Sequence, residues 1–82
     1  MEQEIIISDI KKYIEQNILS EDVVIDSGTG LSDAGVDSFS IVEIILFIER
    51  KYGVAIPDDQ LIPDNFRTLQ TLSSTVMALI RK

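Results

Sequence analysis

The stretch Gly35-Val36-Asp37-Ser38-Phe39-Ser40 lies where a loop rich in turn residues gives way to a strongly apolar segment. Asp37 suits a helix N-cap, because its carboxylate can accept free N–H groups of the first turn and faces the positive end of the helix dipole. Gly53 suits the position just after a helix. These boundaries predict a helix over residues 38–52, and we expect the rest of the chain to hold that helix in place.

Apolar side chains form two stripes on this predicted helix when residues are placed 100° apart. The stripe that we expect to face the core comprises Ile41, Ile44, Ile45, Ile48 and Tyr52. The second stripe, beside Ser38, comprises Phe39, Val42 and Leu46. Either the helix is covered on both sides or the second stripe is exposed for a partner, and we favour partial exposure. Phe47 falls on neither stripe.

Two further amphipathic helices flank this one in the sequence. The first is predicted over residues 3–17, with Ile5 off its core stripe and the remaining apolar positions at Ile6, Ile7, Ile10, Tyr13 and Ile14. The last is predicted over residues 69–81, with Thr68 as its N-cap and Arg81-Lys82 at the negative end of its dipole. Its apolar stripe comprises Leu69, Leu72, Val76, Leu79 and Ile80.

The two connections differ in length and composition. Residues 19–36 are rich in turn residues, Ser20 among them, and predict a long loop attached to the core by Val23, Val24, Ile25 and Leu31. The loop does not fit a calcium-binding EF-hand loop that begins at Asp26. Gly28 and Gly30 occupy the third and fifth positions, which need oxygen ligands, and Leu31 occupies the sixth, which needs a glycine.

The second connection, residues 54–67, holds both prolines. Pro57-Asp58-Asp59 predicts the first turn of a short helix that ends by Ile62, because Pro63 disfavours helical backbone in the residue before it. Leu61, Ile62 and Phe66 are expected to fill gaps between the longer helices. The fold class is therefore all-α: a small four-helix bundle with three longer helices, one short helix and a long first loop.

Composition limits the class of function. The 82 residues predict a single domain, residues 1–82, with a formal net charge of -7. This charge argues against nucleic acid and anionic membranes as partners, and favours enzymes with basic docking patches. The chain has no apolar run long enough to span a membrane and an acidic N-terminus unlike a signal peptide, so we expect a cytoplasmic protein. A monomer is the default expectation for its oligomeric state.

The chain contains neither cysteine nor histidine. It therefore lacks the residues for a Ser-His-Asp triad, a cysteine nucleophile or a typical zinc site, and we expect neither catalytic residues nor a metal. Ser38 is a poor nucleophile but a good acceptor, because a phosphodiester attached there would face the positive end of a helix. The ordinary alternative is that Ser38 only provides a good helix start.

The Asp37-Ser38-Phe39 junction, with Gly35 three residues before the serine, resembles the Asp-Ser-Leu motif of acyl carrier proteins. The similarity extends over nearly the whole chain: its length and acidity, the four-helix layout, Leu31 in the loop and the stretch from Tyr52 to Asp58. The short motif alone is weak evidence, but its place in an acidic all-α domain makes the resemblance strong.

The resemblance implies that Ser38 receives a 4′-phosphopantetheine arm from coenzyme A, attached by a separate phosphopantetheinyl transferase. The arm would carry acyl groups as thioesters to enzymes of fatty acid, polyketide or related lipid biosynthesis. Positions used in the family for partner docking match Asp37, Phe39, Val42, Glu43, Leu46 and Glu49. Core positions that part to admit an acyl chain match Ile44, Ile48 and Tyr52.

Several residues depart from the family pattern. Phe39 replaces the usual leucine and Ser40 a common acid, while Arg50 and Lys51 occupy positions that are often acidic. We interpret these differences as signs of a specialised carrier with a dedicated pathway. Two alternatives remain open: an aminoacyl or peptidyl carrier of a nonribosomal peptide pathway, and an interaction domain that keeps the fold but is never modified.

Overall fold

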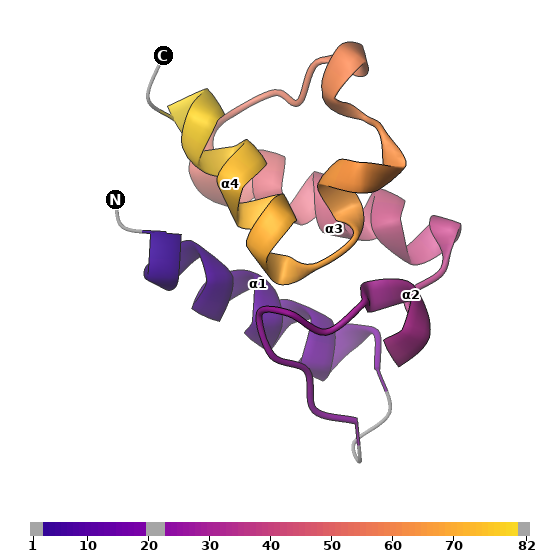
Figure 1. The fold of residues 1–82 in the computed structure, drawn as a ribbon. Coiled ribbons are helices and arrows are strands. Elements are labelled where there is room, and N and C mark those ends of the chain that lie inside the picture. The colour runs from indigo at the N-terminus through magenta and orange to yellow at the C-terminus, as the bar shows by residue number, and fades with distance from the viewer. Residues whose placement is uncertain (1–2, 20–22, 81–82) are drawn as a thin grey trace.

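The computed structural model describes residues 3–19 and 23–80. The chain forms two α-helices of about four turns, a single-turn α-helix between them and a shorter last α-helix, which follows two consecutive 3₁₀ turns (Figure 1). In chain order the elements are α1 (Gln3–Asn17), α2 (Leu31–Ala34), α3 (Ser38–Tyr52), η1 (Asp58–Gln60), η2 (Pro63–Phe66) and α4 (Leu69–Ile80). No strand occurs within these described ranges, so the predicted all-α class is confirmed.

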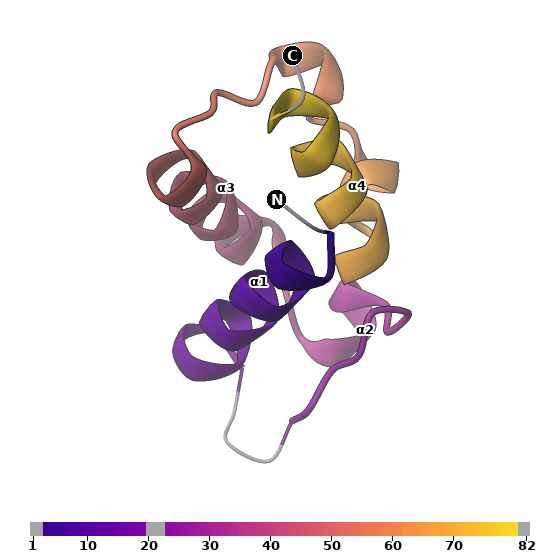
Figure 2. The same ribbon diagram turned by 90° about the vertical axis from the view of Figure 1, so that its left-hand side faces the viewer.

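The core lies between α1, α3 and α4, which surround it in the view of Figure 2. Each helix contributes residues spaced by three or four positions, the spacing that places side chains on one helix face. The side chains that are fully buried there are Ile6, Ile10, Ile14, Ile44, Ile48, Leu69, Leu72 and Val76. The core stripes predicted for the three longer helices are therefore confirmed, with Ile5 exposed as expected.

The helix boundaries follow the local capping chemistry. At the start of α4, the Thr71 N–H donates to Thr68 Oγ1 at 3.2 Å while the Thr68 N–H donates to Thr71 Oγ1 at 3.1 Å. Gly53 ends α3 in the left-handed conformation at φ 64°, where a side chain would be strained. The predicted caps at Thr68 and Gly53 are thus confirmed, whereas Ser20 and Arg81-Lys82 lie outside the described residues.

A short helix forms after Pro57, as predicted, but it is a 3₁₀ turn and not an α-helix. The segment after Pro57 forms the 3₁₀ turns η1 and η2, with Pro57 preceding η1, and the fourth α-helix is α2, inside the predicted long loop. The residue before Pro63 is extended, at ψ 150°, so the predicted end of the short helix by Ile62 is confirmed.

Two gap-filling predictions and one predicted loop contact also need correction. Leu61 and Ile62 are exposed, and of the three residues proposed there only Phe66 is buried. In the first loop Ile25 is buried while Val24 is exposed. The Ile25 N–H donates to Glu15 Oε2 at 3.0 Å, which attaches this part of the loop to α1.

Candidate functional site

Ser38 is the first residue of α3, at a sharp change of chain direction between α2 and α3 (Figure 1). Gly35 makes this turn possible because it adopts φ 109°, a left-handed conformation that favours glycine. The Val36 N–H donates to the Leu31 carbonyl at 2.9 Å, and both side chains are buried. These contacts fix the elbow to the core and leave Ser38 exposed.

Asp37 caps α3, as predicted. Its Oδ1 accepts a hydrogen bond from the Ser40 N–H at 2.8 Å, and its carbonyl accepts from the Ile41 N–H at 3.0 Å. The hydrogen bond from Ser40 lowers the pKa of the Asp37 carboxyl group. The negative charge of Asp37 therefore stabilises the helix end from which the Ser38 hydroxyl extends.

An open cleft of about 490 Å³ borders Ser38. Its apolar lining comes from α2, the turn after it, α3 and η2. The residues are Leu31, Val36, Ile41, Pro63 and Phe66. Arg67 also lines it, and the Arg67 carbonyl accepts from the Leu31 N–H at 2.8 Å, which joins this edge to α2. The guanidinium pairs with Asp64. The cleft thus combines an apolar wall with charged residues of both signs, Asp33, Asp37 and Arg67, and borders an exposed hydroxyl.

The second apolar stripe of α3 is exposed to solvent. Phe39, Val42 and Leu46 are 75%, 55% and 48% exposed, so the predicted partial exposure is confirmed. We call these three residues the outer strip. It lies on the same helix as Ser38 and begins at the next residue, so an enzyme that contacts it would also reach the Ser38 hydroxyl.

Two carboxylates predicted to frame this strip have different surroundings. Glu43 lines a groove between α3 and α1. Glu49 is instead directed at its own chain, because its Oε2 accepts from the Ile56 N–H at 3.0 Å. Glu49 therefore holds the segment after α3 against the helix, a contact that helix periodicity cannot predict.

The residues matched to an acyl-chain pocket lie in the core. Ile44 and Ile48 are fully buried. Tyr52 is half-buried, and its hydroxyl donates to Asp9 Oδ2 at 2.9 Å, which links the end of α3 to α1. Burial raises the pKa of Tyr52, and the hydrogen bond to Asp9 raises it further.

The described residues contain no cluster of three or more acidic, histidine or cysteine side chains arranged to hold a metal ion. Nor is any helix among them both long and apolar enough to cross a membrane.

Comparison with known proteins identifies the family. Residues 8–76 match the family described as "Phosphopantetheine attachment site". The chain belongs to the acyl carrier protein family. Its cofactor is therefore covalently attached 4′-phosphopantetheine, and it is a carrier protein.

Relatives with different cargoes are similar to this carrier. Aminoacyl carrier protein 1 of Bradyrhizobium diazoefficiens is 33% identical, over 93% of this chain and 82% of the relative. The acyl carrier protein of Zymomonas mobilis is 37% identical, over 61% of this chain and 65% of the relative. The similarity to an aminoacyl carrier therefore extends over more of the chain.

Solved structures agree with this assignment. The carrier is similar to a chain in a crystal structure of Bradyrhizobium japonicum glycine:[carrier protein] ligase with its cognate carrier protein, at 33% identity and a TM-score of 0.73. The match covers 93% of this chain and 96% of the other. The Thermotoga maritima acyl carrier protein, at 18% identity, has a TM-score of 0.78 over 99% of this chain and 93% of its own, and shows the shared fold.

The residues around Ser38 fit the cofactor. The attachment point needs an exposed hydroxyl, and Ser38 provides one at a helix N-terminus, where N–H groups and the dipole favour a phosphodiester. Arg67 lines the cleft that borders Ser38, where its guanidinium is paired with Asp64. Its place beside Ser38 was not predicted, because it depends on how η2 folds back towards α2.

A second feature was also missed. Phe47, which fell on neither predicted stripe, stacks on Tyr13 of α1, with ring centroids 4.2 Å apart and an interplanar angle of 18°. Tyr13 lies on the core side of its own helix, so its pairing with Phe47 follows from how α1 and α3 cross. No periodic pattern in either helix indicates it.

Proposed function

We propose that Ser38 carries the 4′-phosphopantetheine arm and that residues 1–82 act as one non-catalytic carrier domain. The observation that carries this proposal is the exposed hydroxyl at the first position of α3, beside an open cleft. When bound, the arm supplies the terminal thiol on which cargo is held, which this cysteine-free chain cannot provide. Asp37 and Val36 hold the helix start in position, and an external transferase supplies the catalytic groups.

Partner enzymes are proposed to dock on the outer strip and on the polar residues beside it. The exposed apolar area of Phe39, Val42 and Leu46 gives an enzyme the surface from which binding energy comes. Asp37 and Glu43 would meet basic residues of the enzyme. Glu49 is proposed as a weaker contributor, because its carboxylate already accepts the Ile56 N–H.

For the cargo, we propose an amino acid, with an acyl group as the second candidate. The support is that the relatives matched over 93% and 88% of this chain are both aminoacyl carrier proteins. An amino acid on the arm needs no space in the core, where Ile44 and Ile48 are fully buried. An acyl chain would have to part those side chains, as the family resemblance implies for Ile44, Ile48 and Tyr52.

The modification is tested by intact mass after incubation with coenzyme A, magnesium and a broad-specificity phosphopantetheinyl transferase. We expect one phosphopantetheine on the parent and on Ser40→Ala, and none on Ser38→Ala. Modification of folded Ser38→Ala would contradict the assignment. A parent that no transferase modifies, the cognate enzyme included, would favour the unmodified interaction domain.

The cargo is tested on the modified carrier. Incubation with glycine:[carrier protein] ligase, ATP and amino acids is compared with incubation with an acyl-transferring enzyme and its acyl donor. Gain of an aminoacyl mass would support the first candidate. Gain of an acyl mass alone would favour the second, and Ile48→Val would then be expected to change the chain length that is accepted.

A further inference from the structure

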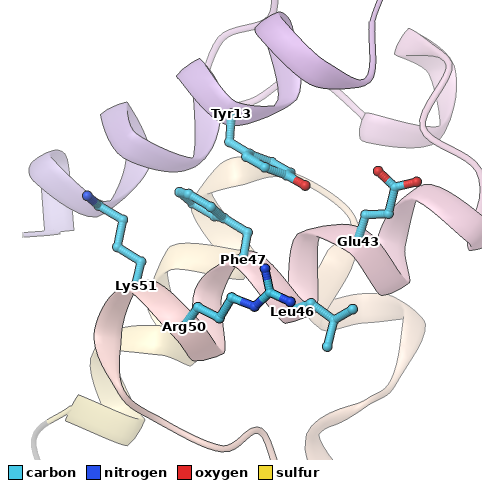
Figure 3. Close-up of a pocket in the computed structure, with 6 residues that line it drawn as sticks. All are labelled: Tyr13, Glu43, Leu46, Phe47, Arg50 and Lys51. Carbon is cyan, nitrogen blue, oxygen red and sulfur yellow. The ribbon is translucent and has the colours of Figure 1, made fainter.

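A groove between α1 and α3 lies apart from the Ser38 cleft. It has a volume of about 420 Å³, and its lining residues are Tyr13, Glu43, Leu46, Phe47, Arg50 and Lys51 (Figure 3). We call it the α1–α3 groove. Leu46 belongs to both the groove and the outer strip, so the two surfaces are continuous.

The floor of the groove is aromatic. The stacked rings of Tyr13 and Phe47 come from different helices, and both side chains are only partly buried. In Figure 3 the two rings face each other between the helices, with Leu46 at one side. An apolar side chain laid on these rings would remove aromatic surface from water, the main source of binding energy at protein interfaces.

The charges around this floor have two signs. Arg50 and Lys51 are both exposed, while Glu43 lies further along the groove (Figure 3). Among the described residues the ion pair within 4.0 Å joins Arg67 and Asp64, so neither Arg50 nor Lys51 has a carboxylate partner there. Lys12 and Asp9 line a neighbouring hollow that shares Tyr13, Phe47 and Lys51, so two cations face one carboxylate there. One end of the groove is thus basic, in a chain with a net charge of -7.

We propose that the α1–α3 groove receives an acidic segment of a partner enzyme, with an apolar side chain on the Tyr13–Phe47 floor and carboxylates beside Arg50 and Lys51. Because Leu46 belongs to both surfaces, an enzyme on the outer strip can reach the groove. The proposal rests on the proposed carrier function only in taking the occupant to be a partner enzyme of the carrier. Glu43 repels a carboxylate at the opposite end and so sets the direction of the segment.

The same charges select between enzymes. A partner whose docking patch is basic along its whole length meets Asp37 favourably but is repelled by Arg50 and Lys51. A partner with basic residues near Ser38 and acidic residues further along matches both ends of α3. The groove therefore acts on partner choice, in addition to any contact made beside Ser38.

Two other occupants fit less well. A small anion would find the cations on an open surface, whereas small-ligand sites bury most of the ligand. A second copy of this chain brings another net charge of -7, and the long-range repulsion opposes its approach.

The test titrates the ¹⁵N-labelled chain with a short synthetic peptide in which leucines are followed by glutamates, and with a matched peptide that has lysines in place of the glutamates. We expect the acidic peptide to shift the backbone amides of Tyr13, Phe47 and Arg50, and the basic peptide to leave them unchanged. Lys51→Glu should weaken binding about threefold, and Arg50→Glu combined with Lys51→Glu about tenfold.

Lys11→Glu is the matched control, because it makes the same change of charge on α1 outside the groove lining. Circular dichroism establishes that each variant is folded. Lys51→Gln removes the positive charge at the end of α3 without adding a negative one, and so is a milder change than Lys51→Glu. Equal weakening by Lys11→Glu would mean that only net charge matters, and would overturn the proposal. So would an absence of shifts with the acidic peptide.

Two further outcomes would also overturn it. Saturation of the same shifts by inorganic phosphate would identify an anion site. The same shifts on raising protein concentration alone would identify a second copy. The titration uses the unmodified chain, so its result is independent of whether Ser38 accepts the arm.

Discussion

The two apolar faces of α3 are built from similar residues and have different surroundings. Ile44 and Ile48 are fully buried between α1 and α4, whereas Val42 and Leu46, on the same helix, are about half exposed. Burial of the first face contributes to folding. The second face removes less apolar area from water, so we expect it to contribute less to folding, and we propose it as the surface for partners. The difference shows that hydrophobicity alone does not assign a side chain to stability or to recognition.

The largest effect is expected from truncation on the buried face. Ile48→Ala removes a fully buried side chain and leaves a cavity, so the free energy of unfolding should fall by about 2–5 kcal/mol. Urea denaturation followed by circular dichroism measures it. Ile45→Ala, on a partly buried neighbour, is the control and should cost less. Equal losses for the two variants would mean that the full burial of Ile48 does not set its contribution to stability.

Truncation on the exposed face should affect partner binding more than it affects folding stability. Leu46→Ala removes a side chain that is 48% exposed, so the free energy of unfolding should fall by less than about 1 kcal/mol. The kcat/KM of a partner enzyme should fall about tenfold, because buried apolar anchors dominate interfaces.

The control for Leu46→Ala is Ile5→Ala, which removes an exposed apolar side chain from α1. It should leave both stability and kcat/KM nearly unchanged. If Leu46→Ala lowered stability as much as Ile48→Ala does, the outer strip would have to be treated as core.

Much of this division could be predicted from the sequence. The periodicity of residues 38–52 separates Ile44 and Ile48 from Val42 and Leu46, and Asp37 and Gly53 mark the helix ends through local chemistry. The position of the single-turn helix α2 could not be predicted, because four residues are too few to show a helical period.

Contacts between distant segments were equally inaccessible. The hydrogen bond from Ile56 to Glu49 and the stacking of Phe47 on Tyr13 depend on how the elements pack, not on local pattern. For the same reason Arg67 could not be placed beside Ser38. The residues of the candidate site that lie next to Ser38 in the sequence could be predicted. The residues that line the site from distant segments of the chain could not.

The smallest effect concerns the exposed end of α3 and is visible in its pH dependence. The pKa of Asp37 is below its ordinary value of 3.8 in the folded protein, chiefly because its carboxylate accepts the Ser40 N–H. A depressed folded pKa means that this contribution is present above pH ~4 and is lost as pH falls through the folded pKa. Asp37→Asn keeps a capping side chain but does not titrate.

The parent should therefore be slightly more stable than Asp37→Asn near neutral pH, and the two should converge under acidic conditions. Thermal unfolding of both proteins across this pH range measures the difference. Asp26, whose pKa is lowered chiefly by the Thr29 hydroxyl, titrates in both and cancels in the comparison. A constant difference at all pH values would show that the Asp37 charge does not contribute, and that the Ser38 end of α3 is held by its side-chain cap alone.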